Sequence, residues 1–511
     1  MIEFFERLQA VFNEHPEKTA LAYSGDGSKL SYAELDEFSA RTRAWLKKRG
    51  IGREDRVMIL LERGCMIPAA MLGVFKNASA CIVCEASMAP ERVRYQLADS
   101  AVKAVIDANA LEEIRALEPL FGFEDAGAHD AAYIVYTSGS TGNPKGVIHE
   151  FGNLDQIIHA MRFDGEYLFR SSDVFAFSSP LSFVAAYDFQ LNAFARGAGV
   201  LIADPDSVRN PEKLIALYEA HGVSAAFMTP SLFRTLKRFN SQMQWMIIGG
   251  EPCVNISHDS IRLYNFYNMS EAGRVMLGFR IDRAYDVTPV GINRCGEEVL
   301  LLDEADLPVA DGEIGEIAFK NEFVRGYVGL PERTAQSWRG GLFHTGDLAK
   351  RLPDGNVVLL GRNDDMIKIN GNRIEPEEIA SAAKRVLGLS WAAAKGFVTE
   401  ERSFVVLYYT DEVRLDARSA REALSKQLTS YMLPSHFVKL DSIPLLPNGK
   451  LDKKSLPVPD IDLFRTEYAP PETELEEKLL AGFEKVLEAE RLSVNDDFLS
   501  SAAIRFAPSR S

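Results

Sequence analysis

The segment that decides the fold is Tyr136–Gly146, with the sequence YTSGSTGNPKG. An apolar, β-rich run, Ala132–Val135, leads directly into it. Its three glycines and four Ser or Thr residues would expose backbone N–H groups and short hydroxyls, which bind phosphate oxygens, and Lys145 adds a positive charge. Pro144 stands where a Walker A loop has its second glycine, so an ordinary nucleotidase P-loop is disfavoured. The segment therefore predicts a phosphate-binding loop of another kind.

Length and composition set the limits around this loop. At about 100–200 residues per domain, 511 residues indicate two to four domains. The chain is 46% hydrophobic and 25% charged, which is typical of a globular protein. Its net charge of −16 disfavours nucleic acid as a partner, because bulk acidity repels phosphate backbones. One small anion in a local basic pocket remains compatible with that charge.

The cysteines and apolar runs indicate a cytoplasmic setting. Five cysteines are too few for a disulfide framework in so long a chain and suggest reduced thiols. Cys81 and Cys84 form one C-x-x-C without a second pair at zinc spacing, so we interpret Ser79–Val83 as a buried strand rather than a metal or redox site. Met1–Glu14 lacks the apolar core of a signal peptide. Charged residues interrupt Val57–Phe75, so no membrane span and no membrane partner are expected.

The first 360 residues alternate β-rich runs with amphipathic helical stretches. We expect strands at Arg56–Leu61, Ala80–Cys84, Ala104–Ile106, Val174–Ser178, Gly199–Ala203, Ala225–Met228 and Met246–Ile248. We expect helices at Tyr32–Lys48, Ile67–Lys76 and Pro90–Ser100. This alternation predicts an α/β fold with largely parallel sheets.

The pattern changes towards the C-terminus. Short strands between acidic Gly and Pro turns over Glu298–Phe319 predict a β-rich subdomain. We expect domains at 1–362 and 363–458, the second a small α+β domain, and a linker with a helix-containing tail at 459–511. The expected elements of the small domain and tail are Met366–Ile369, Glu375–Val386, Ser403–Tyr409, Ala417–Leu428 and Thr473–Ala489.

The phosphate loop resembles the signature of the adenylate-forming superfamily, and five further motifs follow the order found there. These are Leu30–Leu35 (LSYAEL), Tyr267–Glu271 (YNMSE), His344–Leu348 (HTGDL), Gly361–Gly371 (GRNDDMIKING) and Leu446–Asp452 (LPNGKLD). The chain is thus identified as a member of that superfamily. The Pro-Asn-Gly-Lys sequence and the carrier-like C-terminal helix are typical of its nonribosomal peptide synthetase branch, the adenylation domains.

This resemblance implies a large N-terminal adenylation domain and a small mobile C-terminal domain. It implies that the protein activates a carboxylic acid with ATP and Mg²⁺ as an acyl-AMP, releases pyrophosphate, and transfers the acyl group to the phosphopantetheine thiol of a carrier protein. An acyl- or aryl-CoA ligase is the alternative. A non-catalytic interaction protein of the same fold is a third hypothesis, against which Lys145, Glu271, Asp347, Arg362 and Lys450 argue.

The resemblance assigns the catalytic roles to Lys450, Glu271 and Lys145. Lys450 would bridge the substrate carboxylate and the α-phosphate, unless it is a solvated lysine beside the Asn448-Gly449 turn. Glu271 would bind Mg²⁺, which prefers one or two carboxylates together with phosphates.

The nucleotide site follows from the same motifs. Asp347 would accept the ribose hydroxyls, Arg362 would hold ribose or phosphate oxygens, and Tyr267 would stack on adenine. Asn268 replaces a more usual glycine. The expected nucleotide-binding residues are Thr137, Ser138, Gly139, Ser140, Thr141, Gly142, Gly249, Gly250, Glu251, Tyr267, Asn268, Ser270, Asp347 and Arg362.

Two residues align with family positions that serve the rotation of the small domain and the path of the thiol. Asp364 matches the hinge, where a few residues absorb the backbone rotation between the two half-reactions. Gly371 matches the glycine that lines the thiol tunnel. Either residue could instead serve ordinary turn chemistry.

The expected acid pocket departs from the family. Val184 stands where amino-acid-activating members have an Asp that pairs with the substrate ammonium, and an unpaired buried ammonium is costly. The pocket positions are Val184, Ala185, Asp188, Phe227, Ile247, Gly249, Phe266, Arg274 and Val275. Asp188 and Arg274 could pair with each other, or Asp188 could bind an amine further along the acid. We expect an α-keto, α-hydroxy or aryl acid, or an acid with a displaced amine.

The tail departs as well. Asn495–Leu499 resembles the lead-in to a carrier domain, but the Leu-Gly-Gly-x-Ser attachment site is missing and Ser501 lacks the flanking glycines. We interpret the tail as a truncated or frame-shifted carrier-like fragment. The carrier protein is therefore expected to act in trans.

Overall fold

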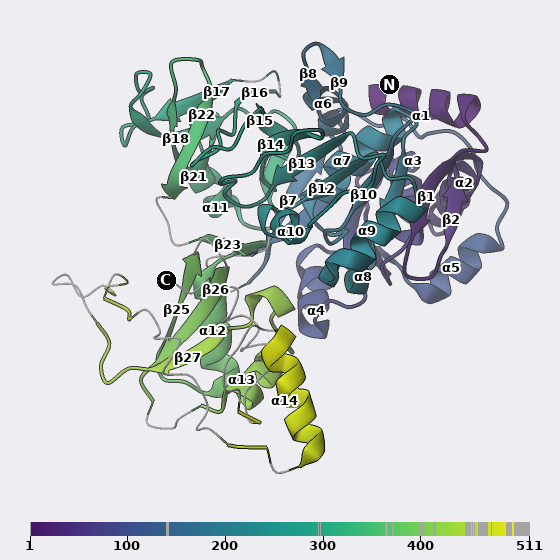
Figure 1. Cartoon of the computed structure of the whole chain (residues 1–511). Helices are drawn as coiled ribbons and strands as arrows, with labels where there is room; N and C mark the ends of the chain where they lie inside the picture. The colour runs from purple at the N-terminus through teal and green to yellow at the C-terminus, as the bar shows by residue number, and fades with distance from the viewer. Residues whose placement is uncertain are drawn as a thin grey trace. The chain divides into compact units, whose positions relative to one another are not determined.

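The chain forms two compact units, which are described separately. The computed structural model describes residues 2–138, 143–294, 296, 298–362, 366–369, 372–398, 403–411, 415–444, 451, 453, 455–457, 469–471, 473–486, 493 and 494. The larger unit comprises Met1–Gly139, Asn143–Met366 and Asn370–Arg373; the smaller comprises Ser140–Gly142, Ile367–Ile369 and Ile374–Ser511. Figure 1 labels their elements. The predicted residues Gly139, Ser140, Thr141, Gly142, Asp364, Gly371 and Lys450 lie outside the described residues.

The larger unit contains a nine-stranded sheet in its described part. Its order is β16 (Ile292–Asn293), β15 (Val275–Ile281), β14 (Arg262–Asn268), β13 (Trp245–Gly249), β12 (Ala225–Met228), β10 (Val174–Phe177), β11 (Gly199–Ile202), β1 (Thr19–Tyr23) and β2 (Lys29–Ser31). The pairs from β14 to β1 are parallel, and antiparallel strands flank them at both edges. Parallel strands are buried on both faces, which explains the continuous apolar runs in the sequence.

A second sheet, six-stranded in the described residues, contains the two strands that flank the predicted phosphate loop. Its order is β19 (Val324–Tyr327), β7 (Lys145–Glu150), β6 (Ala131–Thr137), β4 (Ala80–Glu85), β3 (Arg56–Leu61) and β5 (Ala104–Ile106). The β6, β4, β3 and β5 pairs are parallel, whereas β6–β7 and β7–β19 are antiparallel. The predicted α/β fold with largely parallel sheets is confirmed.

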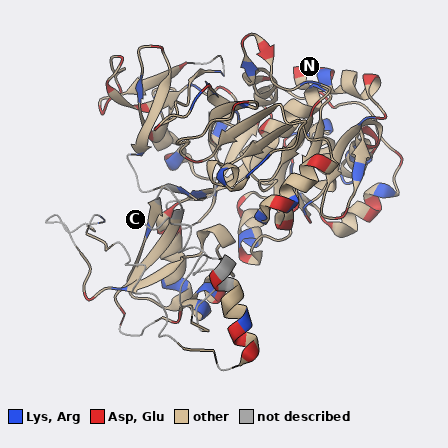
Figure 2. Ribbon diagram, viewed as in Figure 1, with Lys and Arg blue, Asp and Glu red and all other residues tan. Residues whose placement is uncertain are grey.

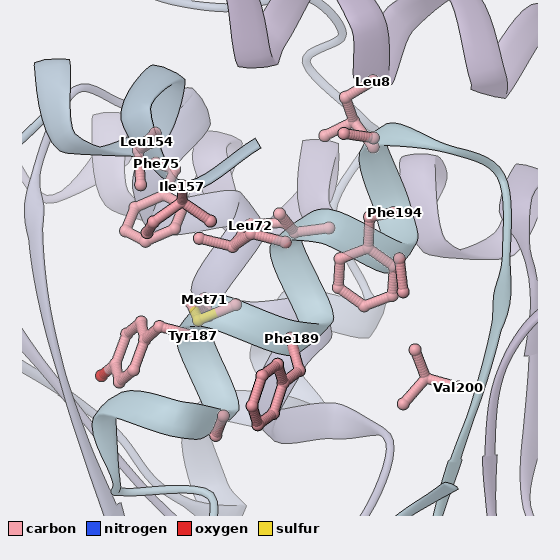
Figure 3. Packing of buried hydrophobic residues seen from close by; sticks show 14 of the residues in the cluster. Leu8, Met71, Leu72, Phe75, Leu154, Ile157, Tyr187, Phe189, Phe194 and Val200 are labelled. Atoms are coloured by element: carbon pink, nitrogen blue, oxygen red, sulfur yellow. The ribbon is translucent and has the colours of Figure 1, made fainter. Parts of the chain in front are cut away.

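Helices fill the space between these two sheets. The helices of the larger unit are α1 (Glu3–Glu14), α2 (Tyr32–Lys48), α3 (Met66–Lys76), α4 (Pro90–Asp99), α5 (Ala108–Arg115), α6 (Gly152–Ala160), α7 (Val184–Ala195), α8 (Pro205–Arg209), α9 (Pro211–Ala220), α10 (Pro230–Thr235) and α11 (Pro331–Ser337). Residues of α1, α2, α3, α6 and α7 form one buried cluster with residues of both sheets. Figure 3 shows Phe75 of α3, Ile157 of α6 and Phe189 of α7 in this core.

Local signals explain where these elements begin. At α2, Ser31 accepts a hydrogen bond from the Glu34 N–H while the Glu34 carboxylate accepts from the Ser31 N–H. This capping box satisfies backbone N–H donors that the first turn of the helix leaves without partners.

The other face of the nine-stranded sheet is covered by α9, which buries Leu214, Ile215 and Tyr218 against the strands. Strands β1, β10, β11, β12 and β13 of the nine-stranded sheet contain no Lys, Arg, Asp or Glu, whereas helices such as α2 and α9 carry several (Figure 2).

The predicted β-rich region forms a five-stranded sheet in the larger unit. Its described strands are β17 (Val299–Leu302), β18 (Ile314–Phe319), β21 (Leu342–Arg351), β20 (Trp338–Arg339) and β22 (Val357–Arg362), which pairs with β21. A separate hairpin joins β8 (Arg162–Phe163) to β9 (Glu166–Tyr167). All pairs in both sheets are antiparallel, and β21 brings the His344–Leu348 motif to the site.

The smaller unit is an α+β body with its own core. Its elements are β23 (Ile367–Ile369), α12 (Pro376–Leu387), β25 (Ala392–Val398), β26 (Ser403–Tyr409), α13 (Ala417–Leu424), a 3₁₀ turn (Ser430–Met432), β27 (His436–Lys439) and α14 (Glu474–Val486). A short strand, β24 (Asn372–Ile374), includes residues of both units. Helix α13 ends at Leu424, four residues before the predicted end. Leu428 is nevertheless buried in the core, which explains why the apolar periodicity extended that far.

Other sequence expectations concern the thiols and the membrane. Cys65, Cys81, Cys84 and Cys253 are buried free thiols, and burial raises the pKa of Cys81 and Cys84 to about 12. Such thiols are inert, in agreement with their structural interpretation. No helix in the described part of the chain is long and apolar enough to cross a bilayer.

Candidate active site

The segment predicted to bind phosphate lies between two antiparallel strands, β6 and β7, rather than at the start of a helix. Thr137 at the end of β6 pairs with Lys145 at the start of β7, so both residues are fixed by the six-stranded sheet. Both are buried, and the Thr137 hydroxyl has no hydrogen-bond partner among the described residues. An orphaned buried hydroxyl beside a lysine fits a phosphate oxygen. The Ser138 hydroxyl donates to the Arg373 carbonyl over 3.0 Å.

Glu271 lies at the centre of a charged cluster. Its carboxylate is fully buried, and its Oε1 accepts a hydrogen bond from the Tyr327 hydroxyl at 2.9 Å. The Arg373 Nη1 lies 3.0 Å from Oε1 and 3.2 Å from Oε2. The Lys145 Nζ lies 3.7 Å from Oε1 and donates to the Tyr327 oxygen at 3.2 Å. Two cations therefore surround one carboxylate, which leaves a local positive charge suited to an anion.

The protonation states follow from these contacts. Burial alone would raise the pKa of Glu271, but Arg373 and then Lys145 outweigh it and hold the pKa at about 2. Glu271 is therefore ionised at neutral pH. Burial, with Glu271 beside it, raises the pKa of Tyr327 well above its usual range, so this hydroxyl remains a donor.

The donor set fits Mg²⁺ only in combination with a nucleotide. No group of three or more His, Cys, Asp or Glu side chains that could hold a metal occurs in the described parts of the chain. One ionised carboxylate, Glu271, is what a Mg²⁺ ion shared with phosphates requires from a protein. Lys145, Thr137 and Ser138 would hold the phosphates themselves.

Buried side chains form hydrogen bonds with the backbone around Glu271. The Asn321 side-chain amide donates to the Glu271 carbonyl at 2.8 Å and to the Ala272 carbonyl at 3.2 Å. Arg274 donates to the Asn321 side chain at 3.3 Å and to that of Asn153 at 3.0 Å. All these groups are buried. The position of the Glu271 carboxylate is thus determined by a hydrogen-bonded network and not by its own loop alone.

Asp347 forms the second polar centre. Tyr267, at the end of β14, donates its hydroxyl to the Asp347 carboxylate at 2.6 Å, and Arg362 forms an ion pair with the other oxygen. Antiparallel pairing of β21 with β22 places Arg362 opposite Asp347. Burial, with Asp347 beside it, raises the pKa of Tyr267 well above its usual range, so Tyr267 donates and Asp347 accepts. A carboxylate held in this way can also accept sugar hydroxyls.

The expected acid pocket centres on the first two turns of α7. Val184 and Ala185 keep partial exposure at its start, whereas Asp188, one turn later, is fully buried. Asp188 accepts hydrogen bonds from the side-chain amides of Asn268 at 3.0 Å and Asn192 at 3.4 Å. Burial raises the pKa of Asp188 well above its usual range, against the opposing charge of Arg274. Asn268 thus joins the nucleotide motif directly to the pocket position that could bind an amine.

The Gly249–Glu251 segment also lies where its motif predicts, after β13. A Cβ atom at Gly249 would lie 3.0 Å from the Phe266 carbonyl and 3.7 Å from Phe227, so only glycine fits without displacing its neighbours. The Glu251 carboxylate accepts from the N–H and the hydroxyl of Ser231, at 3.1 and 2.6 Å. Glu251 therefore anchors this segment to α10.

His149 packs beneath the site as part of an aromatic stack. Its ring is 4.5 Å from Tyr133, and Tyr133 is 4.5 Å from Tyr187 on the other side. Burial lowers the pKa of His149 to about 3, from 6.5. The unfolded chain thus takes up a proton as the pH falls through 6.5, whereas the folded protein does not until about pH 3. Folding stability must therefore decrease as the pH falls below 6.5.

We expect His149→Phe to remove this pH dependence while keeping the stack. When the pH is lowered from 7 to 5, the unfolding free energy of the wild type should decrease by about 2 kcal/mol more than that of the variant. Denaturant unfolding of both proteins at the two pH values measures the difference. Equal losses in the two proteins would show that His149 does not titrate in this way.

Comparison with known proteins identifies the family. The model of the AMP-binding enzyme family matches residues 8–328. The chain belongs to the AMP-binding enzyme family. It is 31% identical over 516 residues to bacitracin synthase 1 of Bacillus licheniformis, covering 95% of this chain and 10% of that protein. It is 30% identical over 541 residues to surfactin synthase subunit 3 of Bacillus subtilis, covering 96% of this chain and 41% of that protein. The chain spans less than half the length of these relatives.

Two solved structures share the AMP-binding fold with this chain. An o-succinylbenzoate CoA synthetase from Bacillus subtilis superposes with a TM-score of 0.76 at 19% identity, covering 88% of this chain and 98% of that one. An artificially fused adenylation–PCP di-domain from Klebsiella oxytoca superposes with a TM-score of 0.74 at 19% identity, covering 85% and 86%.

The larger unit of this AMP-binding enzyme brings five of the predicted site residues together in two polar centres, and other predicted residues lie outside them. Lys145 joins Glu271, and Tyr267 joins Asp347 and Arg362. Ser270 is partly exposed beside Glu271, and Gly250 follows β13 in a left-handed conformation. Phe227, Ile247, Phe266 and Val275 are buried on neighbouring strands of the nine-stranded sheet.

Sequence reasoning missed three residues that contact Glu271 or its backbone: Tyr327, Arg373 and Asn321. Tyr327 belongs to β19, whose pairing with β7 brings together segments 182 residues apart. Arg373 follows the Gly361–Gly371 motif by two residues, and this short distance from a motif could have marked it as a candidate site residue. Nothing local in the sequence indicated Asn321.

Proposed function

We propose that this protein activates a carboxylic acid with ATP as an acyl-AMP and then transfers the acyl group to a carrier-protein thiol. The observation that carries the proposal is the buried Lys145–Tyr327–Glu271 cluster together with the Asp347–Arg362 pair. The first suits the phosphates and their metal, and the second suits a ribose. Membership of the AMP-binding enzyme family supports the same reaction.

In the first step a carboxylate oxygen of the acid attacks the α-phosphorus of ATP. A new O–P bond forms, the bond between the α-phosphorus and its bridging oxygen breaks, and pyrophosphate leaves with that electron pair. Lys145 neutralises charge on the phosphate oxygens, and we assign Lys450 to the reacting carboxylate and α-phosphate. Mg²⁺, held by Glu271, would supply further charge neutralisation when bound.

In the second step the thiol sulfur attacks the acyl carbon. A C–S bond forms, the bond between the acyl carbon and the AMP phosphate oxygen breaks, AMP leaves with that electron pair, and the thiol proton passes to solvent. We propose that the thiol is the phosphopantetheine arm of a carrier protein acting in trans, and that Asp364 and Gly371 serve the rotation and the thiol path. The similarity to peptide synthases supports this acceptor. The buried free thiols are compatible with a cytoplasmic location.

We further propose that the acid lacks an α-ammonium in the usual place. Val184 offers no carboxylate there, and Phe227, Ile247 and Phe266 are apolar. A keto, hydroxy or aryl acid, or one whose amine reaches Asp188, would avoid an unpaired buried ammonium.

Pyrophosphate exchange tests the proposal. The full chain is screened with amino, hydroxy, keto and aryl acids, and acids that support exchange are then offered free CoA or a phosphopantetheinylated carrier protein. We expect exchange with a non-α-amino acid and acylation of the carrier rather than of CoA. Thioester formation on CoA alone would indicate an acyl- or aryl-CoA ligase. Absence of exchange with every acid would support a non-catalytic protein.

The chain's own tail provides a second check. Incubation with a phosphopantetheinyl transferase and CoA should leave the mass of the chain unchanged, because Asn495–Leu499 is not followed by an attachment motif. A gain of about 340 Da, the mass of one phosphopantetheine group, would refute the assignment of the carrier to a separate chain.

A further inference from the structure

Tyr327 stands between the two most important charges of the site. Its hydroxyl accepts a hydrogen bond from Lys145 at 3.2 Å and donates one to Glu271 at 2.9 Å. The direction of both bonds is fixed, because an ammonium group only donates and an ionised carboxylate only accepts. The Lys145 Nζ also lies 4.5 Å from the centre of the Tyr327 ring. One side chain therefore contacts both residues at once.

The distance between the two charges shows what the hydroxyl does. Lys145 Nζ and Glu271 Oε1 are 3.7 Å apart, longer than the roughly 2.8 Å of a direct charge-assisted hydrogen bond. The carboxylate has another close cation in Arg373. We propose that Tyr327 is a positioning residue whose hydroxyl keeps Lys145 from closing onto Glu271, so that the lysine stays available to phosphate and the carboxylate to Mg²⁺. This inference rests on the proposed function, because it assumes that ATP binds at Lys145.

The fold explains why Tyr327 can act as a spacer. It is the last residue of β19, where it lies opposite Val147 of β7, two residues from Lys145 and therefore on the same face of the sheet. Its backbone N–H donates to the Thr334 hydroxyl at 3.0 Å, which ties the strand end to α11. Its ring packs edge-on against Trp338 at 5.4 Å. Strand pairing, a hydrogen bond and ring packing together fix where the hydroxyl stands.

Tyr327→Phe removes the hydroxyl and keeps the ring. Lys145 should then pair directly with Glu271, and the affinity for ATP without metal should fall about tenfold or more, the effect of losing one charge-assisted contact. Calorimetric titration of the full-length protein with ATP in EDTA measures this affinity without requiring turnover. Tyr32→Phe is the matched control, because it removes another buried hydroxyl hydrogen bond, to the Ala198 carbonyl, and should leave ATP binding unchanged.

A double-mutant cycle separates spacing from damage to the fold. In a Glu271→Gln background Lys145 has no carboxylate to close onto, so adding Tyr327→Phe should change metal-free ATP affinity by less than about threefold. Circular dichroism confirms folding of each variant. The inference is overturned if Tyr327→Phe leaves metal-free ATP binding at the wild-type level, or if its effect is equally large in the Glu271→Gln background. If the wild type binds no ATP, both the proposed function and the role of Tyr327 are wrong. If the wild type binds ATP but the variants do not behave as expected, only the role of Tyr327 is wrong.

Discussion

Lys450→Ala should abolish acyl-adenylate formation and leave the thiol-transfer step largely intact. We expect pyrophosphate exchange to fall about 10²–10³-fold, the range found when one preorganised group that stabilises transition-state charge is removed. Transfer from a chemically supplied acyl-AMP to the carrier should stay within a few-fold of wild type, because Lys450 is assigned to the first step only. Rapid-quench assays of the two half-reactions measure both rates.

Lys426→Ala provides the control for this experiment. Lys426 also belongs to the smaller unit but is exposed just after α13, so its removal should leave both half-reactions unchanged. An equal loss in both half-reactions for Lys450→Ala would indicate a general defect. Near wild-type exchange would show that the motif resemblance has assigned the wrong lysine.

Asp188→Asn should change which acids the protein accepts. For an acid whose amine lies beyond the α-carbon, such as 3-aminobutanoate, we expect kcat/KM to fall about 100-fold, because the desolvated ammonium would lose the Asp188 carboxylate as its partner. For keto and aryl acids the change should stay within about threefold. The variant is isosteric and can still accept from Asn268, so the fold should be kept. Exchange kinetics with matched acids give both values.

Val184→Asp is the complementary variant. It restores a carboxylate one helical turn before Asp188, at the position that amino-acid-activating relatives use, and should raise activity with α-amino acids. Equal effects of Asp188→Asn on all acids would assign Asp188 to the internal network of Asn268 and Asn192. A wild type that already prefers an α-amino acid, with no gain from Val184→Asp, would contradict the pocket argument as a whole.

The sequence predicted the parts of the site that lie within single motifs. Lys145, Glu271 and Asp347, which the structure places in the two polar centres, were singled out because short, ordered segments mark them. Arg56–Leu61 was predicted to the residue because buried parallel strands are continuous apolar runs. The α/β class followed from the alternation of such runs with helical periodicity. These signals are local, so they are readable without knowledge of the folded chain.

The missed contacts depend on pairing between distant segments. Tyr327 meets Lys145 only because β19 pairs with β7, and no local pattern encodes which strand an edge strand will join. Asn321 reaches the Glu271 backbone from the loop that precedes the same strand. The end of α13 was predicted wrongly for a related reason. The apolar periodicity of the sequence indicates that Leu428 is buried, but it does not indicate that the helix ends at Leu424.

In the proposed acid pocket, helix α7 connects the buried core with the residues that would select the substrate, and this would constrain how new specificities can arise. Tyr187, Phe189 and Phe194 are packed between the two sheets (Figure 3), while Val184 and Ala185 of the same helix remain partly exposed. Replacing a large core side chain typically costs 2–5 kcal/mol, a large part of the stability of a domain. Variation in the first turn carries no such penalty. Changes of substrate preference should therefore arise mainly from substitutions at positions 184 and 185. Laboratory selection for other acids should be most productive when its libraries are confined to that turn.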